Sequence, residues 1–158
     1  MMSEMVLKFI EQFALSFISA VGFAIIWQVP KSGWVYAGLC GTGGWLVYWA
    51  ANLLELGPAL SNFLGSLTIA AISYYLARWR RTPATLYNIP GITSLVPGGT
   101  SYKMTYSLIT GQYTKAVEYG LSVMVVAGAI AGGLIIFEIA RRNLRTKIFP
   151  IAKRKRPF

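Results

Sequence analysis

The chain has 158 residues, of which 55% are hydrophobic and only 13% are charged, and its mean hydropathy is +0.53. A soluble domain carries about 25% charged residues, spread along the sequence, so this composition argues against a soluble globular protein. The formal net charge of +10 comes from clusters of Lys and Arg beside long apolar runs, which is typical of membrane proteins, so no nucleic-acid partner is expected.

The apolar runs predict an all-α integral membrane protein with about five transmembrane helices. Each run has about the 17–25 residues that a hydrocarbon core roughly 30 Å thick requires, and lipid forces such a segment to be helical. Glu4, Lys8 and Glu11 leave the N-terminus without the positive region of a signal peptide, so the first helix is predicted to be retained. The predicted helices are 5–29, 34–54, 57–79, 92–113 and 117–140.

Turn residues separate the first three predicted helices. Pro30 and Gly33 lie between the first and second, and Glu55, Gly57 and Pro58 lie between the second and third. These short connections predict antiparallel neighbours.

The fourth predicted helix lies in a less regular region, 82–118, which contains three of the seven prolines. Three arginines, Arg78, Arg80 and Arg81, lie at the end of the third helix, and eight Lys and Arg follow the fifth. If the region crosses the membrane once, both clusters and Lys31 lie on the same side, which places 12 of the 15 basic residues in the cytoplasm. We therefore predict a crossing, with the N-terminus outside and the C-terminus inside.

This topology gives a transmembrane helical domain over 1–140 and a basic cytoplasmic tail over 141–158. The tail contains four consecutive basic residues, 153–156, which are expected to meet anionic lipid headgroups. Five helices without an internal repeat make a thin bundle, so we expect an oligomer or a second subunit to complete it.

Two Pro-Gly pairs predict that the fourth helix is broken. Pro90 and Gly91 form the first predicted break, and Pro97, Gly98 and Gly99 form the second. The part after the second break would begin inside the membrane, where free N–H groups near 99–101 suit a carboxylate.

Polar side chains follow this predicted helix start. Ser101 and Thr105 share a helix face, and Tyr102 precedes Lys103. The ammonium group of Lys103 would lie inside the membrane, where it needs a partner or water. The candidate substrate-binding residues are Pro97, Gly98, Gly99, Ser101, Tyr102, Lys103 and Thr105. Two simpler interpretations stay open: Lys103 could extend to the membrane surface, and the Pro-Gly pairs could be kinks within a packed helix.

Other patterns favour structural roles. Small residues at 128, 129, 132 and 133, and at 37, 38, 41 and 44, predict close helix packing. Glu138 precedes Arg141 and Arg142 at the spacing of an ion pair, although a coupling role is an alternative. With no histidine and one cysteine, Cys40, the chain lacks a ligand set for a metal or cofactor, and neither a cofactor nor an enzyme activity is expected.

The double Pro-Gly segment resembles the threonine/serine exporter family, small-subunit type. The resemblance rests on Pro90-Gly91, the string 95–99 (Leu-Val-Pro-Gly-Gly), Tyr102, the glycine-rich second helix, and the chain's length and basic tail. Ser94 stands where the family pattern leads us to expect a proline, which puts the local bend and the substrate choice in question.

The resemblance implies a subunit that exports small amino acids such as threonine and serine, or dicarboxylates such as succinate. It also implies a larger exporter-family membrane subunit as partner and a multi-pass location in the bacterial plasma membrane. The alternative is a structural or assembly subunit that stabilises a larger transport partner without contacting the substrate.

Overall fold

The computed structural model describes the backbone of residues 2–148 and the side chains of residues 4–143. These residues form six α-helices and a short 3-10 helix, with no strand among them. In chain order the elements are α1 (Met2–Ile26), η1 (Lys31–Gly33), α2 (Trp34–Leu53), α3 (Pro58–Arg80), α4 (Thr85–Thr93), α5 (Gly98–Ile109) and α6 (Tyr113–Ile148).

The first three long helices begin and end within three residues of their predicted bounds. The turn between α2 and α3 has the predicted chemistry: Glu55 and Gly57 have φ angles of 55° and 81°, and Pro58 opens α3. Positive φ is unstrained at glycine, and proline fits the first turn of a helix because no N–H is needed there.

Two predicted helices differ from the structure. The predicted helix 92–113 is two helices, α4 and α5, separated by the residues 94–97, which we call the link. The predicted helix 117–140 is longer, because α6 runs from Tyr113 to Ile148 and so includes the first part of the predicted tail. The basic cluster 153–156 lies outside the described residues.

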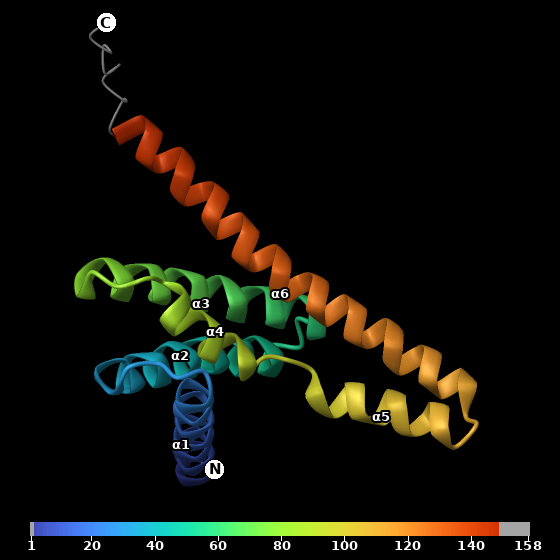
Figure 1. The fold of residues 1–158 in the computed structure, drawn as a ribbon. Coiled ribbons are helices and arrows are strands. Elements are labelled where there is room, and N and C mark those ends of the chain that lie inside the picture. Colours follow the sequence, from blue (N-terminus) through green and yellow to red (C-terminus); the bar gives the residue numbers. More distant parts are fainter. Residues whose placement is uncertain (1, 149–158) are drawn as a thin grey trace, which may run out of the picture.

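Helices α1, α3 and α4 pack around α2 (Figure 1). Helices α2, α3 and α4 lie side by side, α1 packs on α2 and α4, and α6 crosses α3 diagonally. Helix α5 packs chiefly on α6, and the two form a hairpin that extends beyond the other helices. The core therefore lies between α2, α3 and α4, with α6 covering one side.

The glycine-rich face of α2 is the centre of this packing, as predicted. A Cβ atom at Gly41 would lie 2.6 Å from the Cβ of Ala20 in α1 and 3.3 Å from the Cα of Gly91 in α4. A Cβ at Gly44 would lie 2.2 Å from Ile69 in α3. Because hydrogen atoms replace side chains at these positions, three helices approach α2 closely.

The predicted break at Pro90 and Gly91 is not observed, since α4 continues through both residues. Both are buried, and Gly91 packs against Cys40 and Gly41 of α2. Pro90 removes one backbone donor from α4, but contact with α2 holds the helix in place. This pair therefore serves close packing, and the helix ends three residues after Pro90, at Thr93.

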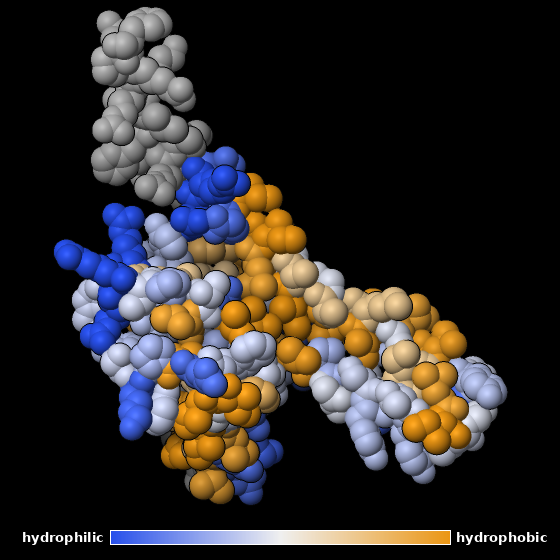
Figure 2. Space-filling model, viewed as in Figure 1, coloured by the Kyte–Doolittle hydropathy of each residue, from blue (hydrophilic) through white to orange (hydrophobic). Residues whose placement is uncertain are grey.

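Exposed side chains identify a membrane surface. Leu7 and Ile18 of α1 and Met124 of α6 are 60% or more exposed, and apolar residues cover much of both helices (Figure 2). Within residues 2–148, three segments are long and apolar enough to span a membrane: Glu4–Ile26, Pro58–Arg80 and Tyr113–Asn143. The protein is thus an all-helical membrane protein, while the count of five spans and their orientation remain predictions.

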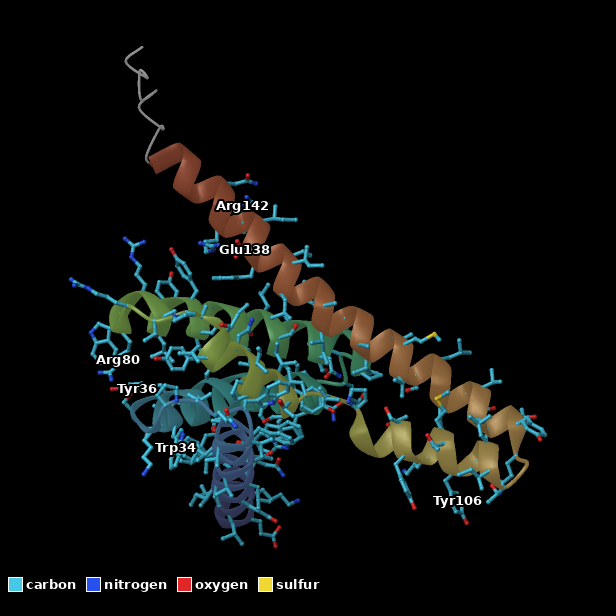
Figure 3. The ribbon with its side chains drawn as sticks, in the orientation of Figure 1. Trp34, Tyr36, Arg80, Tyr106, Glu138 and Arg142 are labelled. Carbon is cyan, nitrogen blue, oxygen red and sulfur yellow. The ribbon has the colours of Figure 1, made fainter. Side chains whose placement is uncertain are left out.

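Hydrophilic side chains gather where α3 ends and along the C-terminal part of α6 (Figure 2). At the end of α3, the guanidinium group of Arg80 lies 4.9 Å from the ring centre of Tyr36, which also contacts the rings of Trp79 and Tyr87 (Figure 3). The hydroxyl groups of Tyr87 and Thr82 are 3.0 Å apart and hydrogen-bonded. This cluster fixes the start of α4 against α2 and α3, and thereby the position of the link.

Candidate functional site

A cavity of about 400 Å³ lies where the link enters α5, and we call it the link cavity. Its walls come from α2, α3, the link, α5 and α6. The residues that line it are Trp45, Tyr48, Pro58, Asn62, Ser94, Leu95, Val96, Pro97, Gly98, Gly99, Thr100, Lys103, Ser122 and Val126. Its volume falls within the range of about 300–1,000 Å³ that is typical of small-molecule sites.

The link is anchored by Leu95, which is 4% exposed and packs near Gly65 of α3. The backbone N–H of Leu95 donates to the carbonyl of Ile92 at 2.8 Å, which closes the last turn of α4. Pro97 then fixes the backbone at the N-cap of α5 with φ −77°, and no side chain caps the helix. The chain is thus held rigidly on both sides of the cavity.

The start of α5 faces this cavity with unused backbone donors. The N–H of Gly98 donates to the carbonyl of Val96 at 2.8 Å, and the next donor with an acceptor is the N–H of Ser101, which bonds to the carbonyl of Pro97 at 3.0 Å. The N–H groups of Gly99 and Thr100 precede it and therefore have no acceptor within the helix. Neither Gly98 nor Gly99 has another atom within 4 Å of the place where a Cβ would lie, so the backbone is open to a ligand.

Polar side chains complete the lining of the link cavity. Lys103 is the one charged residue among those that line it, and Asn62, Thr100 and Ser122 add neutral hydrogen-bonding groups. The hydroxyl oxygen of Ser94 is buried and has no hydrogen-bond partner. The link cavity thus combines an apolar wall with a cation, free N–H groups and an unpaired hydroxyl. These groups are suited to bind an anionic group of a small molecule.

Four of the predicted substrate-binding residues line the link cavity: Pro97, Gly98, Gly99 and Lys103. Ser101 and Thr105 do not, and their hydroxyl groups donate to the backbone carbonyls four residues earlier, at 3.0 and 3.1 Å.

Tyr102 also lies away from the cavity. Its side chain is 71% exposed and stacks on Tyr106, with ring centres 6.4 Å apart, and Figure 3 shows Tyr106 on the projecting hairpin. The polar residues that follow the break therefore divide between the cavity and the outer surface of α5.

Several cavity residues were not predicted. Asn62 and Ser122 are polar residues inside apolar helices, and that signal could have identified them from the sequence. Trp45 and Tyr48 carried no such signal, because aromatic residues are common in membrane helices. Trp45 is oriented by a 2.8 Å hydrogen bond from its indole nitrogen to the side-chain oxygen of Gln12 in α1.

The model of the threonine/serine exporter family matches residues 12–140, which include every residue that lines the link cavity. The chain belongs to the threonine/serine exporter family. A threonine/serine exporter of Corynebacterium glutamicum is 25% identical to this chain over 128 residues. The matched segment is 81% of this chain and 26% of that relative, so the chain spans about a quarter of the relative's length. No solved structure matches the chain.

Membership in this exporter family confirms the family to which the double Pro-Gly segment pointed, while the small-subunit type stays a prediction. The description of the family is that of a threonine/serine exporter. The link cavity and the start of α5 lie within the family's matched region.

Proposed function

We propose that this chain is the small subunit of a two-component exporter in the bacterial plasma membrane, which it crosses several times. The complex would move small amino acids such as threonine and serine, or dicarboxylates such as succinate, out of the cell. Family membership supports the transport of threonine and serine, and the link cavity supports a role in contacting the substrate. The observation that carries the proposal is an open helix start beside Lys103.

The proposed chemistry is recognition of a carboxylate. The N–H groups of Gly99 and Thr100 point out of the first turn of α5, where the helix dipole provides about half a positive charge. Lys103 lies one turn further along the same helix and adds a full positive charge. Both threonine and succinate carry a carboxylate, so this site would hold the group that the proposed substrates share.

A larger membrane subunit is the proposed partner. This chain spans about a quarter of the length of the exporter from Corynebacterium glutamicum. The α5–α6 hairpin extends from the other helices and leaves Tyr102, Tyr106 and Ile109 exposed. That surface is available to a second protein, or to another copy of this chain in an oligomer. The basic tail, 141–158, would meet anionic lipid headgroups.

Export can be measured in bacterial cells that produce this chain together with a larger exporter-like membrane protein. Cells loaded with threonine, serine or succinate should release at least one of them faster than cells that carry empty vectors. The external concentration is followed over time, with production of both chains checked in the membrane fraction. Equal release of all three compounds by both strains would contradict the proposed function.

Lys103→Met should slow export about tenfold or more, because hydrogen bonds to charged groups contribute about 1.5–3 kcal/mol. Lys115→Met is the matched control, since Lys115 is an exposed residue of α6 that does not line the link cavity. Both variants must assemble with the partner as the wild type does. Normal export by Lys103→Met would favour the alternative, a structural subunit that makes no substrate contact.

A further inference from the structure

A second polar cavity, of about 380 Å³, lies between α3, α4 and the C-terminal half of α6. We call it the ion-pair cavity, and its polar lining residues are Ser73, Tyr74, Asn88, Glu138 and Arg141. Along α3, Tyr74 is 12 residues beyond Asn62 of the link cavity, or roughly 18 Å at 1.5 Å per residue. The two cavities therefore lie toward opposite ends of α3.

Tight packing separates these two cavities. A Cβ atom at Gly133 would lie 2.1 Å from the hydroxyl oxygen of Ser66, where α6 crosses α3. Ile69 is fully buried and Ile130 is 6% exposed. Because this packing closes the space between them, the ion-pair cavity is a separate site.

One negative and one positive group stand together in the ion-pair cavity. The Nε atom of Arg141 donates to a carboxylate oxygen of Glu138 at 2.9 Å, and a second nitrogen of Arg141 contacts the other oxygen. The side chains of Glu138 and Arg141 are 52% and 27% exposed, so a ligand from solution can reach both. Figure 3 shows Glu138 on the part of α6 that continues past α3.

Neighbouring residues keep these groups in place. The guanidinium carbon of Arg141 lies 4.9 Å from the ring centre of Tyr74, a contact that holds the arginine even when its carboxylate partner is engaged elsewhere. The side-chain oxygen of Asn88 lines the same cavity, is buried and has no hydrogen-bond partner. A buried acceptor without a donor is costly, and an ammonium or hydroxyl group in the cavity would satisfy it.

We propose that the ion-pair cavity is a second binding site, for a zwitterionic α-amino acid. Arg141 binds the carboxylate, Glu138 binds the ammonium group, and the side-chain oxygen of Asn88 accepts a hydrogen bond from the ligand. The ion pair between Arg141 and Glu138 is exchanged for two pairs with the ligand, so the net charge of the cavity does not change. This inference rests on the proposed export function and adds to it a second site, which would bind one of the two proposed substrate classes.

The same charges discriminate among ligands. A dicarboxylate such as succinate brings two negative charges beside Glu138, and like charges in contact are unfavourable. The link cavity has no carboxylate among the residues that line it, so its chemistry suits either kind of substrate. The ion-pair cavity is therefore the site that would select amino acids over dicarboxylates.

The test is equilibrium binding of radiolabelled threonine to the purified full-length chain in lipid nanodiscs. The Lys103→Met variant is used throughout, so that binding in the link cavity is weakened. Competitors are unlabelled threonine, threoninol, which lacks the carboxylate, 3-hydroxybutyrate, which lacks the ammonium group, and succinate. Threonine should compete at concentrations about tenfold or more below those of the other three, because each loses one charged contact.

Substitutions assign the two charges. Adding Glu138→Gln should weaken threonine binding about tenfold and remove its advantage over 3-hydroxybutyrate, while Glu138→Asp should retain most of the binding. Adding Arg141→Gln should instead remove the advantage over threoninol. Thermal denaturation of each variant shows whether the fold is kept. The competitor series leaves Glu138 and Arg141 unchanged, so it tests the site even if these variants do not fold.

Two results would overturn this inference. One is the absence of threonine binding to the Lys103→Met chain, and the other is equal competition by threonine, threoninol and 3-hydroxybutyrate. Neither result bears on the export assay, which measures release from cells that carry the wild-type chain and its partner. Failure of the ion-pair site and failure of the proposed function are therefore distinguished.

Discussion

Replacing Gly98 with leucine should abolish most of the export activity and leave the fold intact. Gly98 lines the link cavity, has a negative φ angle, and has no other atom within 4 Å of the place where a Cβ would lie. The new side chain therefore fits the backbone without strain but takes up space at the open start of α5. We expect export to fall by about tenfold or more, equivalent to about 1.4 kcal/mol or more of lost binding.

Gly128→Leu is the matched control for this experiment. Gly128 also has no atom within 4 Å of a Cβ position, but it lies in α6 and lines neither cavity. Efflux rates are compared after both variants have been shown to reach the membrane and to assemble with the partner. Equal export by Gly98→Leu and Gly128→Leu would contradict a substrate site at the start of α5.

The second large effect concerns the crossing of α3 and α6. Gly133→Ala should destabilise the protein by about 1–3 kcal/mol, because its Cβ would lie 2.1 Å from the hydroxyl oxygen of Ser66 and 2.7 Å from the carbonyl oxygen of Phe63. The backbone atoms of α3 cannot move aside without separating the two helices. The measurement is the midpoint of thermal unfolding in detergent.

Gly128→Ala, five residues earlier in α6, provides the control for the crossing. Alanine has a higher helix propensity than glycine by about 1 kcal/mol, and a Cβ at this position would have no atom within 4 Å. This variant should be as stable as the wild type or slightly more stable. If both alanine variants unfolded at the same temperature, the close contact at Gly133 would not be a determinant of stability.

Helix lengths and packing glycines could be predicted from the sequence because each depends on local properties. The apolar runs set the extents of α1, α2 and α3 to within three residues, and the small face of α2 indicated close packing. The small residues of α6 differed in outcome. Gly133 makes the close contact that was predicted for it, whereas a Cβ at Gly128 would have no atom within 4 Å. Which small residue meets a neighbouring helix depends on where the two helices cross.

The predictions for the Pro-Gly pairs differed in outcome for a physical reason. Pro97 is the last residue of the link and the N-cap of α5, and the chain does break there. Pro90 has the same local chemistry, but it is buried beside Gly91, which packs against α2, and α4 continues through both residues. Tertiary contacts decide whether a proline ends a membrane helix, so the sequence around it cannot.

The candidate site was predictable only along α5 itself. Four of its residues were identified by their order after the break, but Asn62 and Ser122 come from helices that approach from elsewhere in the chain. The sequence also did not show which face of α5 meets those helices. For this reason Ser101, Tyr102 and Thr105 were predicted to bind substrate, although they do not line the link cavity. The ion pair of Glu138 and Arg141 was predicted from its spacing, but its cavity depends on α3 and α4.

The length of α6 constrains how the protein sits in a bilayer. Its 36 residues make a rod about 54 Å long, against a hydrocarbon thickness of about 30 Å. Membrane helices tilt by up to about 40°, and even at that tilt several ångströms of the helix would lie outside the hydrocarbon core. One end must therefore stand in the aqueous phase or among the phospholipid headgroups, and the basic residues from Arg141 onward are suited to be that end.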